Sequence, residues 1–234
     1  ETYNTPFQTP PFNKIENRHY MPAIMEGIKQ HNLEIDAIVK NTEPASFENT
    51  FDELDRSGAL LSKVNNIFSN LNGANTNEEF QKIAREIAPL LSKHYDEILL
   101  NDTLFERIKS VYQQRDRLNL DVEEKTLLEK YYKDFVRGGA NLNKKDKIEL
   151  KEINGKLSSL SVKFSENILK DNNAFKLIIT DKGDLAGLPL SLIKGAEETA
   201  INLKLENSWV FTLHKPILIP FLQFSEKRSL REKI

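Results

Sequence analysis

The sequence predicts a mainly α protein: a multi-helix bundle with one long amphipathic helix and a small two-stranded β element. Two observations lead to this prediction. Between residues 19 and 174, apolar residues recur every three or four positions, the repeat of helices that bury one face. Near 175–180 and 209–213 the pattern changes to short, β-branched apolar runs bounded by turn or polar residues, which is typical of strands. We expect these two strands to pair.

Three regions are expected along the chain. Residues 1–18 begin with a stretch rich in Pro, Asn and Thr that has no helical repeat, which predicts an extended N-terminal arm. Residues 19–174 make up a helical N-terminal region. Residues 175–234 form a mixed segment of strand, helix, strand and helix, with a helix over 189–203 between the strands and Ser225 as the cap of the last helix.

Two helices are predicted at the start of the helical region. The first begins at His19 and breaks at 41–44, and the second is capped by Ser46 and runs to the turn at Asn72-Gly73. Their apolar positions are Ala23, Ile24, Ile28, Ile35, Ile38, Val39, Phe47, Phe51, Leu54, Leu61, Val64 and Phe68.

The third helix is expected to start with a capping box, in which the Thr76 hydroxyl and the Glu79 carboxylate each accept a free backbone amide. Pro89 lies inside this helix and predicts a kink or a restart, because proline has no amide hydrogen to donate. A fourth helix follows over 104–118.

The fifth helix opens at Asp121 and Glu124 and closes at Gly138-Gly139, since glycine suits the left-handed residue that ends many helices. The sixth has the clearest pattern of all, because its apolar residues are spaced 3, 4, 3, 4 and 4 apart. They are Leu150, Ile153, Leu157, Leu160, Phe164 and Ile168. This stripe predicts a long amphipathic helix.

Composition excludes several classes of protein. Charged residues make up 29% of the chain, but the formal net charge is only -2, so we expect no general attraction to nucleic acid. The chain has no cysteine, which excludes disulfides, thiolate catalysis and cysteine zinc ligands. Its most apolar run, 216–224, is far shorter than the roughly 20 residues of a membrane helix. The compartment stays open between the cytoplasm and the periplasm of a bacterium.

No catalytic motif is visible in the chain. A catalytic zinc site of the His-Glu-x-x-His kind needs two histidines four apart on a helix, and none of the four histidines has such a neighbour. We expect His19 at a helix start, His31 and His94 among polar helix positions, and His214 just after a strand. There is also no Gly-x-Ser-x-Gly elbow and no phosphate loop. The sequence therefore predicts neither a metal site nor a nucleophile here.

Three stretches nevertheless resemble a known family. They are Asn-Leu-Asn-Gly-Ala-Asn-Thr-Asn at 70–77, Lys-Asp-Phe-Val-Arg-Gly-Gly-Ala-Asn-Leu at 133–142 and Trp-Val-Phe-Thr-Leu-His-Lys-Pro at 209–216. With them, the chain from Asn4 to Ile234 resembles the N-terminal half of the zinc oligopeptidases of the thimet-oligopeptidase family. Within that family it is most similar to the bacterial peptidyl-dipeptidase (dipeptidyl carboxypeptidase) branch.

The resemblance implies a helical protein of two lobes with a deep channel between them. The zinc motif of the family lies in the C-terminal part, and the N-terminal region forms the opposing wall, which admits only short peptides. The intact parent would bind Zn and release C-terminal dipeptides from short oligopeptide substrates. Residues 226–234 still have helical composition without a Gly or Pro stop, so we expect the chain to end before the catalytic zinc domain. Its main partner would then be that missing C-terminal catalytic region.

The candidate substrate-channel residues are Asn72, Asn75, Arg137 and Asn141. Amide side chains can bind a peptide backbone without demanding a particular sequence, which suits a promiscuous peptidase. A plainer interpretation is that Asn and Gly gather at turns because they tolerate positive φ. An alternative function for the whole chain is a free-standing helical module that binds a peptide or protein in a groove.

Overall fold

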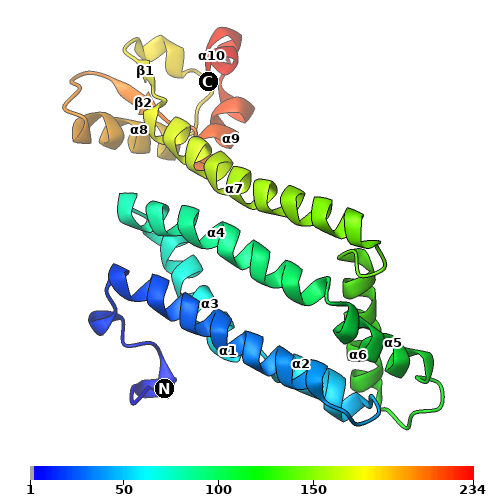
Figure 1. The fold of residues 1–234 in the computed structure, drawn as a ribbon. Helices are drawn as coiled ribbons and strands as arrows, with labels where there is room; N and C mark the ends of the chain where they lie inside the picture. The colour runs from blue at the N-terminus through cyan, green and yellow to red at the C-terminus, as the bar shows by residue number, and fades with distance from the viewer. Residues whose placement is uncertain (1–2) are drawn as a thin grey trace. The chain divides into compact units, whose positions relative to one another are not determined.

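The computed structural model describes residues 3–234, which form helices and one small sheet (Figure 1). This confirms the predicted mainly α class with a long helix and a two-stranded β element. The chain divides into two compact units, Glu1–Lys163 and Phe164–Ile234, and the boundary between them falls inside the longest helix. Each unit is described by itself.

The first unit is built from helices. Short 3-10 turns at Pro6–Gln8, Phe12–Lys14 and Asn17–His19 lead into it. The elements that follow are α1 (Tyr20–Lys40), a π-helical turn η4 (Phe47–Asp52), α2 (Glu53–Arg56), α3 (Ala59–Ala74), α4 (Glu78–Leu99), α5 (Asp102–Gln113), α6 (Val122–Arg137) and the start of α7 (Lys144–Ala174).

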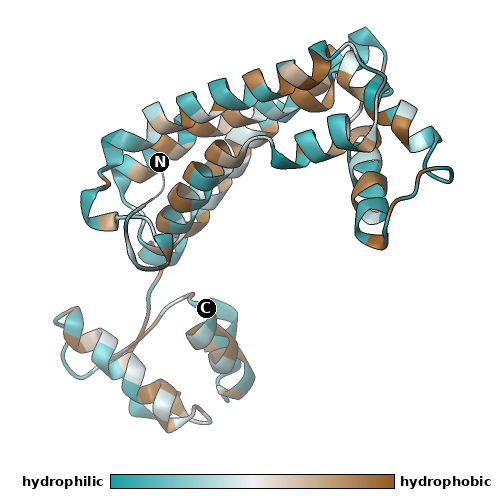
Figure 2. Cartoon of the chain, turned by 90° about the horizontal axis from the view of Figure 1, so that it is seen from below, coloured by the Kyte–Doolittle hydropathy of each residue, from teal (hydrophilic) through white to brown (hydrophobic). Residues whose placement is uncertain are grey.

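Two apolar clusters form the core of this unit, and α1 contributes to both. Its first half places Tyr20 and Ile24 against α3 and α4, while its second half places Ile35 and Ile38 against η4, α5 and α6. Apolar residues accordingly recur along one side of these helices, as Figure 2 shows. The helices of this unit therefore owe their stability to the packing of amphipathic faces rather than to intrinsic propensity.

The second predicted helix is wrong as a single element. Ser46 does cap its start, because its hydroxyl accepts the Asn49 amide at 3.2 Å, but the helix breaks at Ser57 and Gly58. Gly58 has φ 71°, a left-handed conformation that strongly favours glycine. Helix α3 then continues through Gly73 to Ala74, so the predicted stop at Asn72-Gly73 is also wrong.

The predicted capping box of the third helix is wrong by one residue. The N-cap of α4 is Asn77, whose side-chain oxygen accepts the Phe80 amide at 2.9 Å. Thr76 instead donates to Asn72, and the Glu79 carboxylate accepts from Asn17 at 2.6 Å. Asn77 has extended backbone dihedrals, which is the geometry an N-cap requires. Helix α4 runs unbroken past Pro89, so no new helix starts there.

The next two helices mostly follow the prediction. α5 ends at Gln113, short of the expected residue 118. α6 starts with the expected capping box, in which Asp121 and Glu124 each accept the other's backbone amide. It ends at Gly138-Gly139 as predicted: Gly139 has φ 98°, and the Ala140 amide reaches back to the Phe135 carbonyl at 3.0 Å.

The second unit contains the sheet. Strands β1 (Leu177–Ile179) and β2 (Trp209–Phe211) are antiparallel, with Leu177 opposite Phe211, which confirms the predicted pairing. Between them lie a 3-10 turn η5 (Lys182–Leu185) and α8 (Leu190–Asn202), and after them α9 (Lys215–Phe224) and α10 (Arg228–Lys233). Apolar residues from all of these elements form one core.

Ser225 does not cap the last helix, contrary to the prediction. It is the residue that ends α9, and the N-cap position of α10 is Lys227, whose side chain makes no capping bond. The Ser225 hydroxyl is buried without a hydrogen-bond partner, while its carbonyl accepts from Arg231. The residue therefore closes one helix instead of opening the next.

Candidate functional site

The asparagine-rich segment forms the joint between α3 and α4. Asn72 is half-buried in the last turn of α3, and its side-chain oxygen accepts the Thr76 hydroxyl at 2.8 Å. Asn75 is exposed and ends α3, with its amide bonded to the Leu71 carbonyl at 2.9 Å. One oxygen of Asn72 is therefore used in shaping the turn, whereas the Asn75 side chain faces solvent.

The second candidate segment follows α6. Arg137 is the last residue of that helix and Asn141 lies in the turn beyond it, and both are exposed. The backbone between them is fixed by the glycine-based helix stop and by burial of Ala140, which is 5% exposed. Gly138 lies against Leu99, at the end of α4. The segment is thus a hydrogen-bonded turn with two polar side chains at its surface.

The structure does not bring the two segments together. The asparagine-rich joint lies at the start of α4, and the Arg137 turn lies at its end. A helix of 22 residues is about 33 Å long at 1.5 Å per residue. An extended peptide would need about ten residues, at about 3.4 Å each, to reach from one segment to the other. A shorter peptide can contact only one of them.

A buried histidine pair is the most unusual polar feature of the first unit. Nε2 of His94, on α4, lies 2.9 Å from Nδ1 of His31, on α1. His31 is 9% exposed and His94 only 2%. Both were expected at polar helix positions, and both expectations are wrong. His31 follows Ile24 and Gly27 at helical spacing and precedes Ile35, so the apolar repeat itself could have placed it inside.

The proton positions of this pair follow from the hydroxyl at its far end. The Ser57 hydroxyl donates to the Leu54 carbonyl at 2.6 Å, so its oxygen must accept from Nε2 of His31, 3.1 Å away. Nδ1 of His31 then carries no proton and accepts from Nε2 of His94. This leaves Nδ1 of His94 as a buried nitrogen without a partner.

Adding a proton to the pair is unfavourable for two physical reasons. On His94 the proton would occupy a buried nitrogen that has no acceptor, and on His31 it would point at the His94 N–H. Burial accordingly lowers the pKa of His94 to about 4, with the charge of His31 as a second cause. Burial also lowers the pKa of His31, against an opposing effect of Glu34. The pair is therefore neutral at pH 7.

Gly58 is held against the same pair. Its amide donates to the Glu34 carboxylate at 2.7 Å, and a Cβ at this position would lie 2.7 Å from the His31 ring. The break between α2 and α3 is therefore explained by tertiary packing on a buried histidine, which sequence periodicity alone does not reveal.

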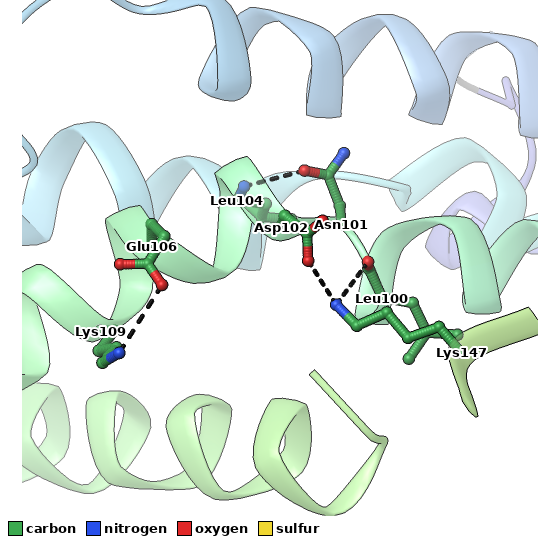
Figure 3. A network of polar contacts seen from close by, with 7 residues as sticks. All are labelled: Leu100, Asn101, Asp102, Leu104, Glu106, Lys109 and Lys147. Carbon is green, nitrogen blue, oxygen red and sulfur yellow. Dashed lines mark hydrogen bonds and ion pairs between the residues drawn. The ribbon is translucent and has the colours of Figure 1, made fainter. Parts of the chain in front are cut away.

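A second polar network joins α4, α5 and α7 (Figure 3). The Lys147 ammonium donates to the Leu100 carbonyl at 3.1 Å and to the Asp102 carboxylate at 2.5 Å. The hydrogen bond and the charge of Lys147 lower the pKa of Asp102. Asn101 caps α5 beside them, with its side-chain oxygen accepting the Leu104 amide at 2.9 Å. These contacts are those of a structural joint.

The start of helix α7 contacts the rest of the first unit mainly through polar residues, with Leu150 packed against Gly139. Of its residues, all of which the structure describes, the only buried one is Lys147. About two turns further on, Asn154 donates to the Asp96 carboxylate at 2.7 Å. The apolar stripe lies about a quarter-turn around the helix, at 100° per residue. Ile153, Leu157 and Leu160 are 51%, 59% and 61% exposed.

The described residues do not fit a zinc site. Within 3–234 no three His, Cys, Asp or Glu side chains lie close enough together to hold a metal ion. The two buried histidines point their nitrogens at each other, 2.9 Å apart, and are hydrogen-bonded there. In the same range, no helix has the length and apolar content needed to cross a membrane.

The chain is similar to peptidases over almost its whole length. The similarity confirms the resemblance to the thimet-oligopeptidase family, although no protein-family model matches the chain. Dipeptidyl carboxypeptidase of Escherichia coli is 35% identical over 98% of the chain, and that of Salmonella typhimurium is 36% identical. Oligopeptidase A of Escherichia coli is 26% identical over the same share. The chain spans only 34% of the length of each of these relatives.

Proposed function

We propose that this chain is the non-catalytic, N-terminal part of a longer zinc metallopeptidase that cleaves short peptides. The observation that supports this proposal is the match to dipeptidyl carboxypeptidases across 98% of the chain, together with its restriction to 34% of their length. About two thirds of such a protein would remain for the catalytic groups. Zinc would be held there, since the described residues of this chain do not fit a zinc site.

The proposed reaction is release of dipeptides from the free C-termini of oligopeptides. Two facts favour it over internal cleavage: the relatives at 35% and 36% identity are named for this activity, and oligopeptidase A is less similar at 26%. The reaction itself would use residues outside this chain. The role of this chain would be to form part of the substrate channel in which the peptide lies.

In this proposal the first unit supplies one wall of the substrate channel. Asn72 and Asn75 at one end of α4, or Arg137 and Asn141 at the other, would contact the peptide backbone. The separation of about 33 Å means that a short substrate meets only one of these pairs. Substituting each pair in turn in the longer protein would show which pair contacts the peptide. Asn72→Ala with Asn75→Ala should raise KM if the asparagine-rich joint is the contact. An unchanged KM would remove this pair from the wall.

The experiment that tests the exopeptidase proposal uses the chain extended to the full length of its relatives. Two peptides of identical sequence are compared, one with a free C-terminal carboxylate and one with a C-terminal amide, and the products are identified by mass spectrometry. We expect dipeptides from the free peptide and little cleavage of the amide. Equal cleavage of both at internal bonds would contradict dipeptide release and favour an endopeptidase.

A further inference from the structure

We infer that the exposed apolar stripe of α7 is the surface on which the rest of the longer peptidase docks. The stripe is defined here as Ile153, Leu157 and Leu160, which lie on the part of α7 that belongs to the first unit. The inference rests on the proposed function, because it takes the docked partner from the longer protein. It adds which surface receives that partner.

The first reason is that two polar residues of α7 already make hydrogen bonds within the first unit. Lys147 and Asn154 reach the carbonyl of Leu100 and the carboxylates of Asp102 and Asp96. A helix normally turns its apolar stripe toward the core and its polar face toward water. Here Leu150 packs against Gly139 beside these polar contacts, but Ile153, Leu157 and Leu160 each remain more than half exposed.

The second reason is the regular spacing of the stripe. Single exposed apolar side chains are common on proteins and need no explanation. These three recur at intervals of four and three residues, and Phe164 and Ile168 continue the repeat along the same helix. Such a continuous apolar row is the helix surface that fits a groove or a second helix.

The third reason is the amount of protein available to cover it. The relatives match this chain over 34% of their length, so they contain about twice as much additional chain. A surface covered within one polypeptide needs no affinity between separate molecules, which makes a short row of three or more apolar residues sufficient. The additional chain is therefore the partner we assign to the stripe.

The test uses the absence of cysteine from these 234 residues. Leu157→Cys and, separately, Leu160→Cys place one thiol on the stripe, and Val122→Cys places one on α6 at a residue that is 83% exposed, as the matched control. Each variant is made in the present chain and in the chain extended to the full length of its relatives. The rate of maleimide labelling at each site is followed by mass spectrometry.

We expect both stripe thiols to react freely in the present chain and at least about tenfold more slowly in the extended one, since a buried thiol reacts only when its surroundings open. The Val122→Cys thiol should react equally in both. Equal rates at the stripe in the two chains would overturn the inference. Slow labelling in the present chain that is relieved by dilution would also overturn it, because a second copy would then cover the stripe.

A peptidase assay separates failure of the proposed function from failure of the docking surface. The extended chain is assayed for peptide hydrolysis in parallel with the labelling. An extended chain that protects both thiols but cleaves no peptide would refute the peptidase proposal while leaving the docking surface in place. A chain that cleaves peptides but leaves both thiols reactive would refute the docking surface alone.

Discussion

The buried histidine pair should make the first unit sensitive to mild acid. A histidine whose folded pKa lies below its unfolded pKa binds its proton more readily in the unfolded chain. Its contribution to stability is therefore fully present above the unfolded value of 6.5 and is lost as the pH falls toward the folded value of about 4. His94 should act in this way, and His31 should add to the effect in the same direction.

The size of the loss follows from these two values. A pKa of about 4 in the fold against 6.5 in the unfolded chain corresponds to about 3 kcal/mol of unfolding free energy by pH 4, at about 1.4 kcal/mol per pH unit. Native domains are stable by about 5–15 kcal/mol, so this is a large share. The part lost between pH 6.5 and 5 precedes the titration of ordinary carboxylates and belongs mainly to the pair.

The assay is urea unfolding between pH 4.5 and 7.5, followed by circular dichroism, with the second unit's tryptophan as a separate probe. The His94→Leu variant should lose stability at pH 7, because Nδ1 of His31 loses its donor, but its stability should change less between pH 6.5 and 5. The control Ile87→Ala removes a buried apolar side chain of the same helix, so it should lower the stability at pH 7 but keep the pH dependence of the parent chain. Identical slopes in parent chain and His94→Leu would refute this account of the pair.

Substitutions at three further residues test the packing and the caps, each by the free energy of unfolding in urea. Gly58→Ala should destabilise by about 2–4 kcal/mol, because φ is 71° and the new methyl group would meet the His31 ring; a loss below about 0.5 kcal/mol would show that the α2–α3 break relaxes easily. Lys147→Met should cost about 1–3 kcal/mol by leaving the buried Leu100 carbonyl without its donor, and an unchanged stability would mean that water replaces the ammonium. Asp121→Ala should cost about 1 kcal/mol through loss of the α6 cap, whereas Asp121→Ser should restore most of it.

Most helices could be predicted from this sequence because their apolar repeat is regular, but α9 (Lys215–Phe224) was not predicted as a helix. The ends were predictable where a single residue type dictates the geometry, as at Asp121 and at Gly139. They were not predictable where neighbouring residues compete for one role. Thr76 and Asn77 are both good N-caps, and only the extended backbone of Asn77 decides between them.

The histidine pair shows a different limit. His31 and His94 occupy apolar positions of their helices, but histidine is polar by type, and only the partner across the interface makes its burial tolerable. The break at Gly58 has the same origin, since it depends on the His31 ring. The apolar repeat could have placed His31 inside, but its pairing with His94 and the packing of Gly58 are tertiary contacts that neither helix reveals by itself.

The candidate site shows a third limit. Sequence reasoning could select Asn72, Asn75, Arg137 and Asn141 as polar residues at turns, but not their separation, which is fixed by the length of α4. It could likewise predict the stripe of α7 but not its exposure. Periodicity reports which face of a helix is apolar and does not say what covers that face.

The central claim is that this chain is one part of a metallopeptidase whose catalytic groups lie in the rest of the protein. The most direct measurement is hydrolysis of a quenched fluorescent oligopeptide in the presence of zinc, by the present chain and by the chain extended to the full length of its relatives. The account predicts cleavage by the extended chain only, abolished by a chelator and restored by zinc. Zinc-dependent cleavage by the present chain alone would contradict it.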